Sequence, residues 1–139
     1  MLEQQLEPAI HDTDAFGHVN NTALPRWFEQ ARTPLFRIIC PSLDPPDWPL
    51  ILVRIEVDFR AEIFYGRPVT VRTAVVRTGN SSFTVAHTAW QQGRIGAAGK
   101  AVLVYVDRSS GRAVRLPDDL RRQLEPYRAT LEDLERPSS

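Results

Sequence analysis

The spacing of hydrophobic positions changes once along the chain. Between residues 22 and 39, apolar residues recur at spacings of three and four, at Leu24, Trp27, Phe28, Ala31, Leu35 and Ile38. This spacing predicts an α-helix with one buried stripe. Pro25 falls in the first turn, where proline is tolerated. Pro34 lies in the interior, so we expect the helix to kink or end near Thr33.

Beyond a proline-containing loop at 41–49, apolar and mostly polar residues alternate. The alternation over 51–60 predicts a strand with one apolar face. Further strands are expected at 69–75, 83–91 and 98–107, separated by turn sequences at 65–68, 79–81 and 92–94. Outside this region we expect a short first strand at 4–11 and a short C-terminal helix from Asp118 to about Tyr127.

The order of these elements is strand, long helix, then four strands joined by tight turns. Strands joined by hairpins form antiparallel sheets, so the pattern predicts an α+β fold with a sheet of about five strands and one long helix. One helix cannot cover both faces and both edges of such a sheet. We therefore expect the part of the sheet that the helix leaves uncovered to be buried against another subunit. The whole chain, 1–139, is expected to be one domain, with its core at about 3–108 and a C-terminal helix and tail at 117–139.

Composition narrows the possible partners and compartment. Hydrophobic residues make up 42% of the 139 residues, which is typical of a soluble globular domain. The 17 basic and 17 acidic residues balance, which argues against a nucleic-acid partner. No apolar run approaches the ~20 residues of a membrane span, and the acidic N-terminus does not resemble a secretory signal. The single cysteine, Cys40, excludes an internal disulfide, so we expect a cytoplasmic protein.

The richest cluster of chemical groups lies just before the predicted helix, at residues 11–21. It contains two carboxylates and two histidines, with Gly17 and the pair Asn20 and Asn21 marking a turn and a helix start. A carboxylate upstream of a helix N-terminus lies near backbone N–H groups that can hold an anion. This combination suits the hydrolysis of an activated acyl group.

Two segments of the sequence resemble those of a known family. Residues 14–21 read Asp-Ala-Phe-Gly-His-Val-Asn-Asn, and residues 27–32 read Trp-Phe-Glu-Gln-Ala-Arg. Over residues 3–107 the chain resembles the hotdog-fold acyl-CoA thioesterases, in particular the 4-hydroxybenzoyl-CoA thioesterase-like branch. One departure is that Leu24, followed by Pro25, replaces the tyrosine that often follows the Asn-Asn pair. The acyl pocket and first helical turn are therefore expected to differ from those of typical members.

The resemblance implies a curved antiparallel sheet wrapped around the long helix, and an acyl-CoA substrate with no cofactor. It also implies a homodimer or homotetramer in which two sheets pair edge to edge and active sites lie at the interface. The family's catalytic carboxylate falls on Asp14, as base or nucleophile. The backbone N–H that polarises the thioester carbonyl falls on Asn21. Some branches place the carboxylate on the helix, where Glu29 stands.

Further site residues follow from the motif and from the needs of a CoA substrate. His18 is expected to support catalysis, and Gly17, Val19 and Asn20 to contact the substrate. Ser82 lies in a region that often contributes to the neighbouring subunit's pocket in this family. The cations available for the CoA diphosphate are Arg60, Arg67, Arg72, Arg77, Arg94 and Lys100. Arg60 is the one we assign to substrate binding.

Each assignment has a structural alternative. Asp14 and the asparagines also suit turn and helix capping, and Glu29 also suits an ion pair with Arg26 or Arg32. Asp12 is interpreted as a structural carboxylate, and His87 as a hydrogen-bonded core histidine.

Other enzyme classes lack their motifs here. With three histidines and no HExxH spacing, no metal site is predicted, and no G-x-S-x-G elbow is present. The sequence therefore predicts an acyl-CoA thioesterase. The alternatives are an acyl-thioester-binding module, an acyl-carrier-protein thioesterase, and a hotdog dehydratase or hydratase.

Overall fold

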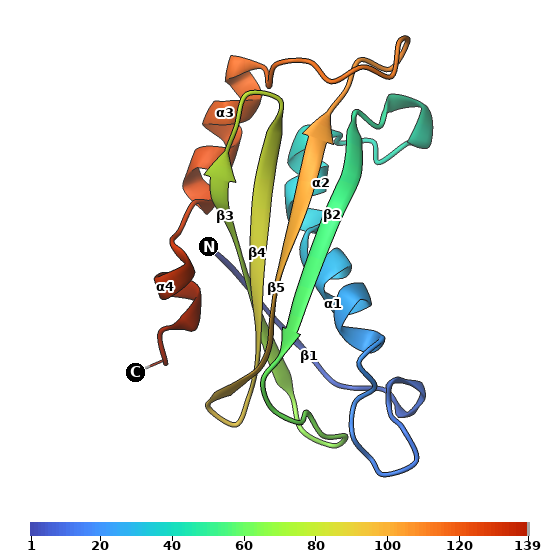
Figure 1. Cartoon of the computed structure of the whole chain (residues 1–139), viewed down its shortest axis with the longest axis vertical. Helices are drawn as coiled ribbons and strands as arrows, with labels where there is room; N and C mark the ends of the chain where they lie inside the picture. The colour runs from blue at the N-terminus through green and yellow to red at the C-terminus, as the bar shows by residue number, and fades with distance from the viewer. Residues whose placement is uncertain (139) are drawn as a thin grey trace.

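A computed structural model describes residues 1–138 of the chain. One antiparallel sheet of five strands runs through the molecule in the order β1-β3-β4-β5-β2 (Figure 1). The strands are β1 (Leu2–Leu6), β2 (Leu50–Phe59), β3 (Val69–Thr78), β4 (Ser82–Gln91) and β5 (Arg94–Tyr105). The predicted α+β class and antiparallel sheet of about five strands are confirmed.

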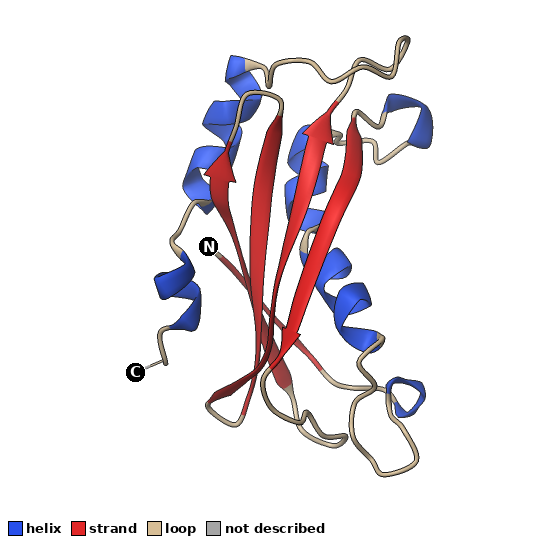
Figure 2. Ribbon diagram, viewed as in Figure 1, coloured by secondary structure: helices blue, strands red, loops and turns tan. Residues whose placement is uncertain are grey.

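Helices lie along both faces of this sheet. α1 (Ala23–Ala31) and α2 (Thr33–Ile39) follow one another behind the strands in the view of Figure 2. Two C-terminal helices, α3 (Asp118–Leu124) and α4 (Leu131–Glu135), follow the last strand. Short 3-10 turns occur at Ile10–Asp12, Pro45–Asp47 and Glu125–Tyr127. Within residues 1–138 no helix combines the length and apolar character needed to cross a bilayer.

The predicted helix break is confirmed, and the predicted first strand is wrong. α1 ends at Ala31 and α2 begins at Thr33, because Pro34 has no N–H to continue the ladder. The sequence places the first strand at 4–11, but β1 spans Leu2–Leu6 and residues 10–12 form a 3-10 turn. The Asp12 carboxylate causes this turn, since its Oδ2 accepts a hydrogen bond of 2.8 Å from the Ala9 N–H.

The inner face of the sheet packs on α1 at very close range. α1 buries a stripe of apolar side chains, at Ala23, Leu24, Trp27, Phe28 and Ala31. Gly99 of β5 lies beneath this stripe. A methyl group there would stand 2.8 Å from the Phe28 ring and 2.8 Å from the Glu56 carbonyl oxygen. Glycine at position 99 therefore sets the distance between helix and sheet.

Gly99→Ala should lower the free energy of unfolding by about 1–3 kcal/mol, because the helix must shift to admit one methyl group. Urea denaturation of the variant measures this loss. Gly79→Ala is the matched control, since its methyl group would meet only the Ser82 side chain and carbonyl, at 3.2 and 3.4 Å. Equal stability of the two variants would contradict the close approach at position 99.

The outer face of the sheet is covered in part by the C-terminal segment. Leu134 of α4 is 1% exposed and packs on Ala74 and Ala86. Arg72, 5% exposed, donates hydrogen bonds to the carbonyl groups of Leu134 and Arg136, and its guanidinium lies 4.6 Å from the centre of the Trp90 ring. The buried Arg72 therefore holds the end of α4 against the sheet.

The free edge of the sheet is apolar. Within residues 1–138, β2 pairs only with β5, and most of its large side chains are exposed. The exposed apolar side chains of this strand are Ile51, Leu52, Val53, Ile55 and Phe59. A register shift between Leu52 and Arg54 makes the predicted alternation of faces irregular at this point. Exposed apolar strand edges are typical of subunit contacts.

Candidate functional site

Asp14 forms the turn that precedes α1. Its Oδ1 accepts hydrogen bonds from the backbone N–H groups of Phe16 (2.8 Å) and His18 (3.2 Å). Gly17 adopts the left-handed conformation that closes this turn, with φ +79°. The Asp14 side chain is exposed, and its Oδ2 receives no hydrogen bond from residues 1–138. One carboxylate oxygen therefore shapes the turn while the other is available to a ligand.

The backbone N–H groups after this turn are not equivalent. The Val19 N–H donates to the Ile63 carbonyl at 2.7 Å, and the Asn20 N–H donates to the Asp12 carbonyl at 2.6 Å. The Asn21 N–H has no acceptor within the described part of the chain. From the sequence alone, the backbone N–H of Val19, Asn20 or Asn21 could donate to an oxyanion. In the structure, Asn21 is the one that remains unpaired at the N-terminus of α1.

Of the two asparagines, Asn20 has the helix-capping role that was the structural alternative for both. Asn20 Oδ1 accepts a hydrogen bond of 3.2 Å from the N–H of Thr22, which occupies the N-cap position of α1. Asn20 therefore supports the helix start, and the Asn21 backbone remains exposed beside it.

A cavity of about 310 Å³ lies next to these amides. It is lined by the start of α1, the end of β2 and the loop that follows β2. Its residues include three of the predicted site residues, Val19, Asn21 and Arg60. The Arg60 guanidinium forms an ion pair with Glu135 of α4. A phosphate group would therefore compete with Glu135 for Arg60.

His18 contacts a carboxylate that the sequence did not reveal. Its Nδ1 lies 3.2 Å from Oε2 of Glu62, and its ring contacts Phe64 edge-on at 5.0 Å. Glu62 also lines the cavity beside Asn21. Its position in an irregular loop carries no periodic signal, so its contact with the Asp14 turn could not be inferred.

Gln91 anchors the loop that supports the turn. This buried side chain donates hydrogen bonds to the carbonyl groups of Phe64 (2.8 Å) and Arg67 (3.1 Å), and accepts one from the Phe64 N–H at 2.9 Å. The loop in turn donates from the Tyr65 N–H to the Gly17 carbonyl at 3.1 Å. Gln91 therefore connects β4 to the Asp14 turn. In the sequence it reads only as the last residue of a strand.

Asp12 has the structural role that was predicted for it. It is 5% exposed, and its Oδ1 accepts a hydrogen bond of 2.7 Å from Arg26. Burial raises the pKa of the Asp12 carboxyl, but the hydrogen bonds from Arg26 and Ala9 outweigh it, so the net pKa lies below the usual range. This ion pair fixes the first turn of α1 to the preceding loop.

Two predicted residues lie apart from the Asp14 turn within one chain. Glu29 is exposed on α1 and lines a different cavity, of about 370 Å³. No ion pair within the described residues joins it to Arg26 or Arg32. Ser82 opens β4 at the end of the sheet away from the loop before α1 (Figure 1). Any role for Ser82 at this site requires a second subunit, as the resemblance implies.

His87 is a core histidine, as predicted. It is 1% exposed, its Nδ1 lies 2.9 Å from the Thr73 hydroxyl, and its Nε2 lies 3.2 Å from the Arg32 guanidinium. The Phe28 ring stacks on it with ring centres 4.8 Å apart. Burial, reinforced by the charge of Arg32, lowers the pKa of His87 to about 3. A neutral ring accepts the Arg32 hydrogen bond at Nε2 and therefore donates from Nδ1 to Thr73.

Because the buried His87 ring is neutral, we expect the folded protein to lose stability in acid. His87 binds its proton near pH 6.5 in the unfolded chain but only near pH 3 in the folded protein. Between these values the unfolded state binds more protons, so stability falls as the pH falls, by up to about 1.4 kcal/mol per pH unit. Urea unfolding between pH 7 and pH 4 measures the slope. His87→Gln should flatten it, and His11→Gln, at a side chain 78% exposed, should not. Equal slopes in both variants would contradict this account.

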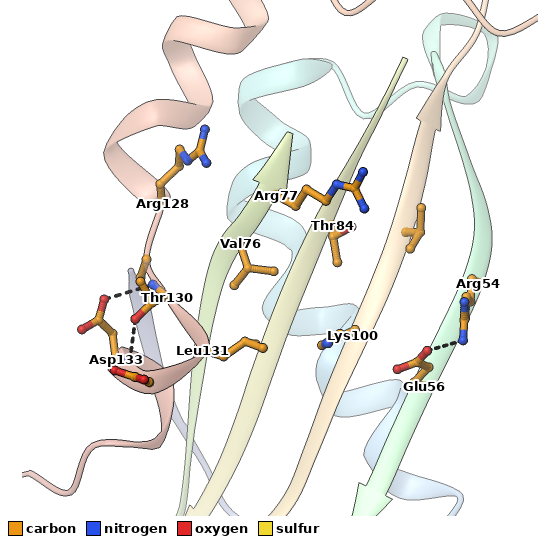
Figure 3. Close-up of a pocket in the computed structure, with 13 residues that line it drawn as sticks. Arg54, Glu56, Val76, Arg77, Thr84, Lys100, Arg128, Thr130, Leu131 and Asp133 are labelled. Atoms are coloured by element: carbon orange, nitrogen blue, oxygen red, sulfur yellow. Dashed lines mark hydrogen bonds and ion pairs between the residues drawn. The ribbon is translucent and has the colours of Figure 1, made fainter. Parts of the chain in front are cut away.

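A larger cavity, about 860 Å³, lies on the outer face of the sheet under the C-terminal segment (Figure 3). Arg77, Lys100 and the ion pair of Arg54 with Glu56 line it, but none of the predicted catalytic residues does. Size alone therefore does not identify the site. Residues 1–138 also hold no group of three or more His, Cys, Asp or Glu side chains placed to bind a metal ion.

Comparisons with known proteins show the family to which the chain belongs. A family model described as the thioesterase-like superfamily matches residues 8–124. A predicted thioesterase from Bacillus stearothermophilus is 35% identical, with a TM-score of 0.88 over 92% of this chain and 96% of that chain. A thioesterase from Thermus thermophilus, solved with coenzyme A and Zn, is 30% identical, with a TM-score of 0.78 over 88% of this chain and 95% of that chain.

A more distant structure shares the fold. A 4-hydroxybenzoyl CoA thioesterase mutant, complexed with 4-hydroxybenzoyl CoA, is 18% identical, with a TM-score of 0.74 over 88% of this chain and 97% of that chain. A comparison with curated protein sequences finds no match. The chain has the hotdog fold and belongs to the thioesterase-like superfamily.

Proposed function

We propose that the protein hydrolyses acyl-CoA thioesters to a carboxylic acid and free CoA. The observation that carries the proposal is that Asp14 Oδ2 and the Asn21 N–H, both in the short segment before α1, have no hydrogen-bond partner within residues 1–138. A relative 30% identical to this chain was solved with coenzyme A, which supports a CoA ester as substrate. The thioester would lie in the cavity beside Asn21.

In the proposed reaction, a water molecule attacks the thioester carbon while Asp14 Oδ2 accepts its proton. The carbonyl oxygen becomes an oxyanion and accepts a hydrogen bond from the Asn21 N–H. The C–S bond then breaks, and the CoA thiolate leaves and takes up a proton. Asp14 as nucleophile, forming an anhydride that water then hydrolyses, gives the same products. The contact between His18 and Glu62 would position the turn.

We infer that two copies of the chain complete the site through the exposed edge of β2. A single chain leaves Asp14 exposed and places Ser82 at the other end of the sheet. Pairing two β2 edges would bury the apolar side chains of that strand and enclose the cavity beside Asn21. The buried, lone Cys40 suits a reducing compartment such as the cytoplasm.

Thiol release from a panel of short, long and aromatic acyl-CoA esters tests the proposal. Hydrolysis of at least one ester class by the wild type supports it. Tight binding of the esters with no thiol release would instead favour an acyl-thioester-binding module. Hydration of an enoyl-CoA, followed by ultraviolet absorbance, would favour a hydratase.

A further inference from the structure

Two cavities lie between α1 and β2, one near each end of the helix. The first contains Asn21 and Leu24 at the start of the helix and Phe59 at the end of β2. The second contains Glu29 near the end of the helix and Leu52 near the start of β2. α1 and β2 run beside one another over this length (Figure 1). The second cavity therefore lies farther along the helix than the first.

The second cavity is apolar on most sides. Phe36 and Trp48, in edge-on contact with ring centres 5.0 Å apart, form one wall. Leu52 and Leu103 of the sheet form another. The space, about 370 Å³, suits a hydrocarbon or aromatic segment of a ligand.

Among the described residues that line this cavity, Arg32 is the one cation. Its side chain is 4% exposed, and its Nη1 donates to His87 at 3.2 Å. Its Nε is buried and has no hydrogen-bond partner within residues 1–138. No carboxylate in that part of the chain lies at ion-pair distance from it, since Glu29 is exposed and acts only from farther away.

A buried cation with a neutral partner is unusual, because taking an unpaired charge out of water is unfavourable. His87 does not neutralise Arg32, since a ring whose pKa is near 3 is uncharged at neutral pH. Structural arginines are normally paired with a carboxylate or with several carbonyl groups, as Arg72 is here. Arg32 instead lines a cavity, and its Nε has no hydrogen-bond partner within residues 1–138.

We propose that this cavity binds an anionic group at the far end of the acyl chain, so that the preferred substrates are CoA thioesters of dicarboxylic acids. This inference rests on the proposed function. The thioester would lie at Asn21 and the terminal carboxylate at Arg32, eleven residues farther along the chain, or roughly 16 Å along helical backbone. The carboxylate would supply the missing counter-ion, and the chain between the two ends would run along α1.

Paired substrates test the proposal. We compare kcat/KM for the mono-CoA thioesters of straight-chain dicarboxylic acids with that for monocarboxylic acyl-CoA esters of equal length. The wild type should prefer the dicarboxylic ester by at least about tenfold at its best chain length. Arg32→Met, which keeps an apolar side chain but removes the charge, should lower this preference by roughly 10- to 100-fold. Arg37→Met, at an exposed position of α2 outside the cavity, should leave it unchanged.

A binding measurement separates this proposal from the proposed function. Calorimetric titration with octanoate and with the neutral octanamide, which has the same chain length, needs no catalysis. Stronger binding of octanoate by the wild type, lost in Arg32→Met, supports the anion site even if no ester is hydrolysed. Equal binding of the two compounds by the wild type would overturn it, even if thioesterase activity is found or Arg32→Met does not fold. An unchanged dicarboxylic preference in a folded Arg32→Met protein would overturn it as well.

Discussion

Asp14→Asn lowers kcat for acyl-CoA hydrolysis by about 10²- to 10⁴-fold, the usual contribution of a positioned acid–base group. Asparagine keeps a side-chain oxygen that can accept the hydrogen bonds from Phe16 and His18, so the turn should persist. The amide cannot accept the proton of water or attack the thioester carbon. We therefore expect the loss mainly in kcat, measured by thiol release, with a smaller change in KM.

Asp44→Asn is the matched control, because Asp44 is exposed in the loop before β2 and its side chain makes no hydrogen bond within the described residues. It should keep wild-type turnover. Urea denaturation of both variants confirms that folding is equal. If a folded Asp14→Asn protein retained turnover within threefold of wild type, Asp14 would be a turn-forming residue only, and the catalytic carboxylate would lie elsewhere.

Ile55→Glu separates the subunits and abolishes most of the activity. Ile55 is 49% exposed near the middle of β2, whose outer edge has no partner strand within the described residues. In a pair of β2 edges related by a two-fold axis, each copy would bring its own carboxylate into the apolar contact. Both the burial of charge and the mutual repulsion oppose association. Light scattering should show a dimer or tetramer for the wild type and a monomer for the variant.

Val114→Glu controls for the added charge, because Val114 is also partly exposed, at 36%, but lies outside β2. It should keep both the assembly and the activity. A wild-type protein that is monomeric and active at assay concentration would contradict an interfacial site. So would an Ile55→Glu monomer with full activity.

The sequence predicts those elements of the fold that follow from periodic burial. The stripe from Leu24 to Ile38 indicates the helix, and Pro34 indicates its break, because both effects are local. The first strand is misplaced because a side chain ends it. The hydrogen bond from the Ala9 N–H to Asp12 turns the chain, and such side-chain contacts leave no trace in hydrophobic spacing.

The same limit applies to the candidate site. The Asp14 turn, Gly17 and Asn21 belong to one contiguous segment, so their chemistry is visible in the sequence. The residues that support the segment come from elsewhere in the chain. Gln91 bonds a residue 27 positions away and Arg32 bonds one 55 positions away. The sequence also cannot show that the Val19 and Asn20 N–H groups are already bonded, which leaves Asn21 as the donor.

A crystal structure of the Asp14→Asn variant with an intact acyl-CoA tests the central claim most directly. The account predicts the thioester in the cavity between the start of α1 and the end of β2, enclosed by a second subunit. Its carbonyl oxygen should lie about 3 Å from the Asn21 nitrogen, with its carbon beside the side chain at position 14. A thioester bound instead in the cavity under α4, remote from Asn21, would contradict the account.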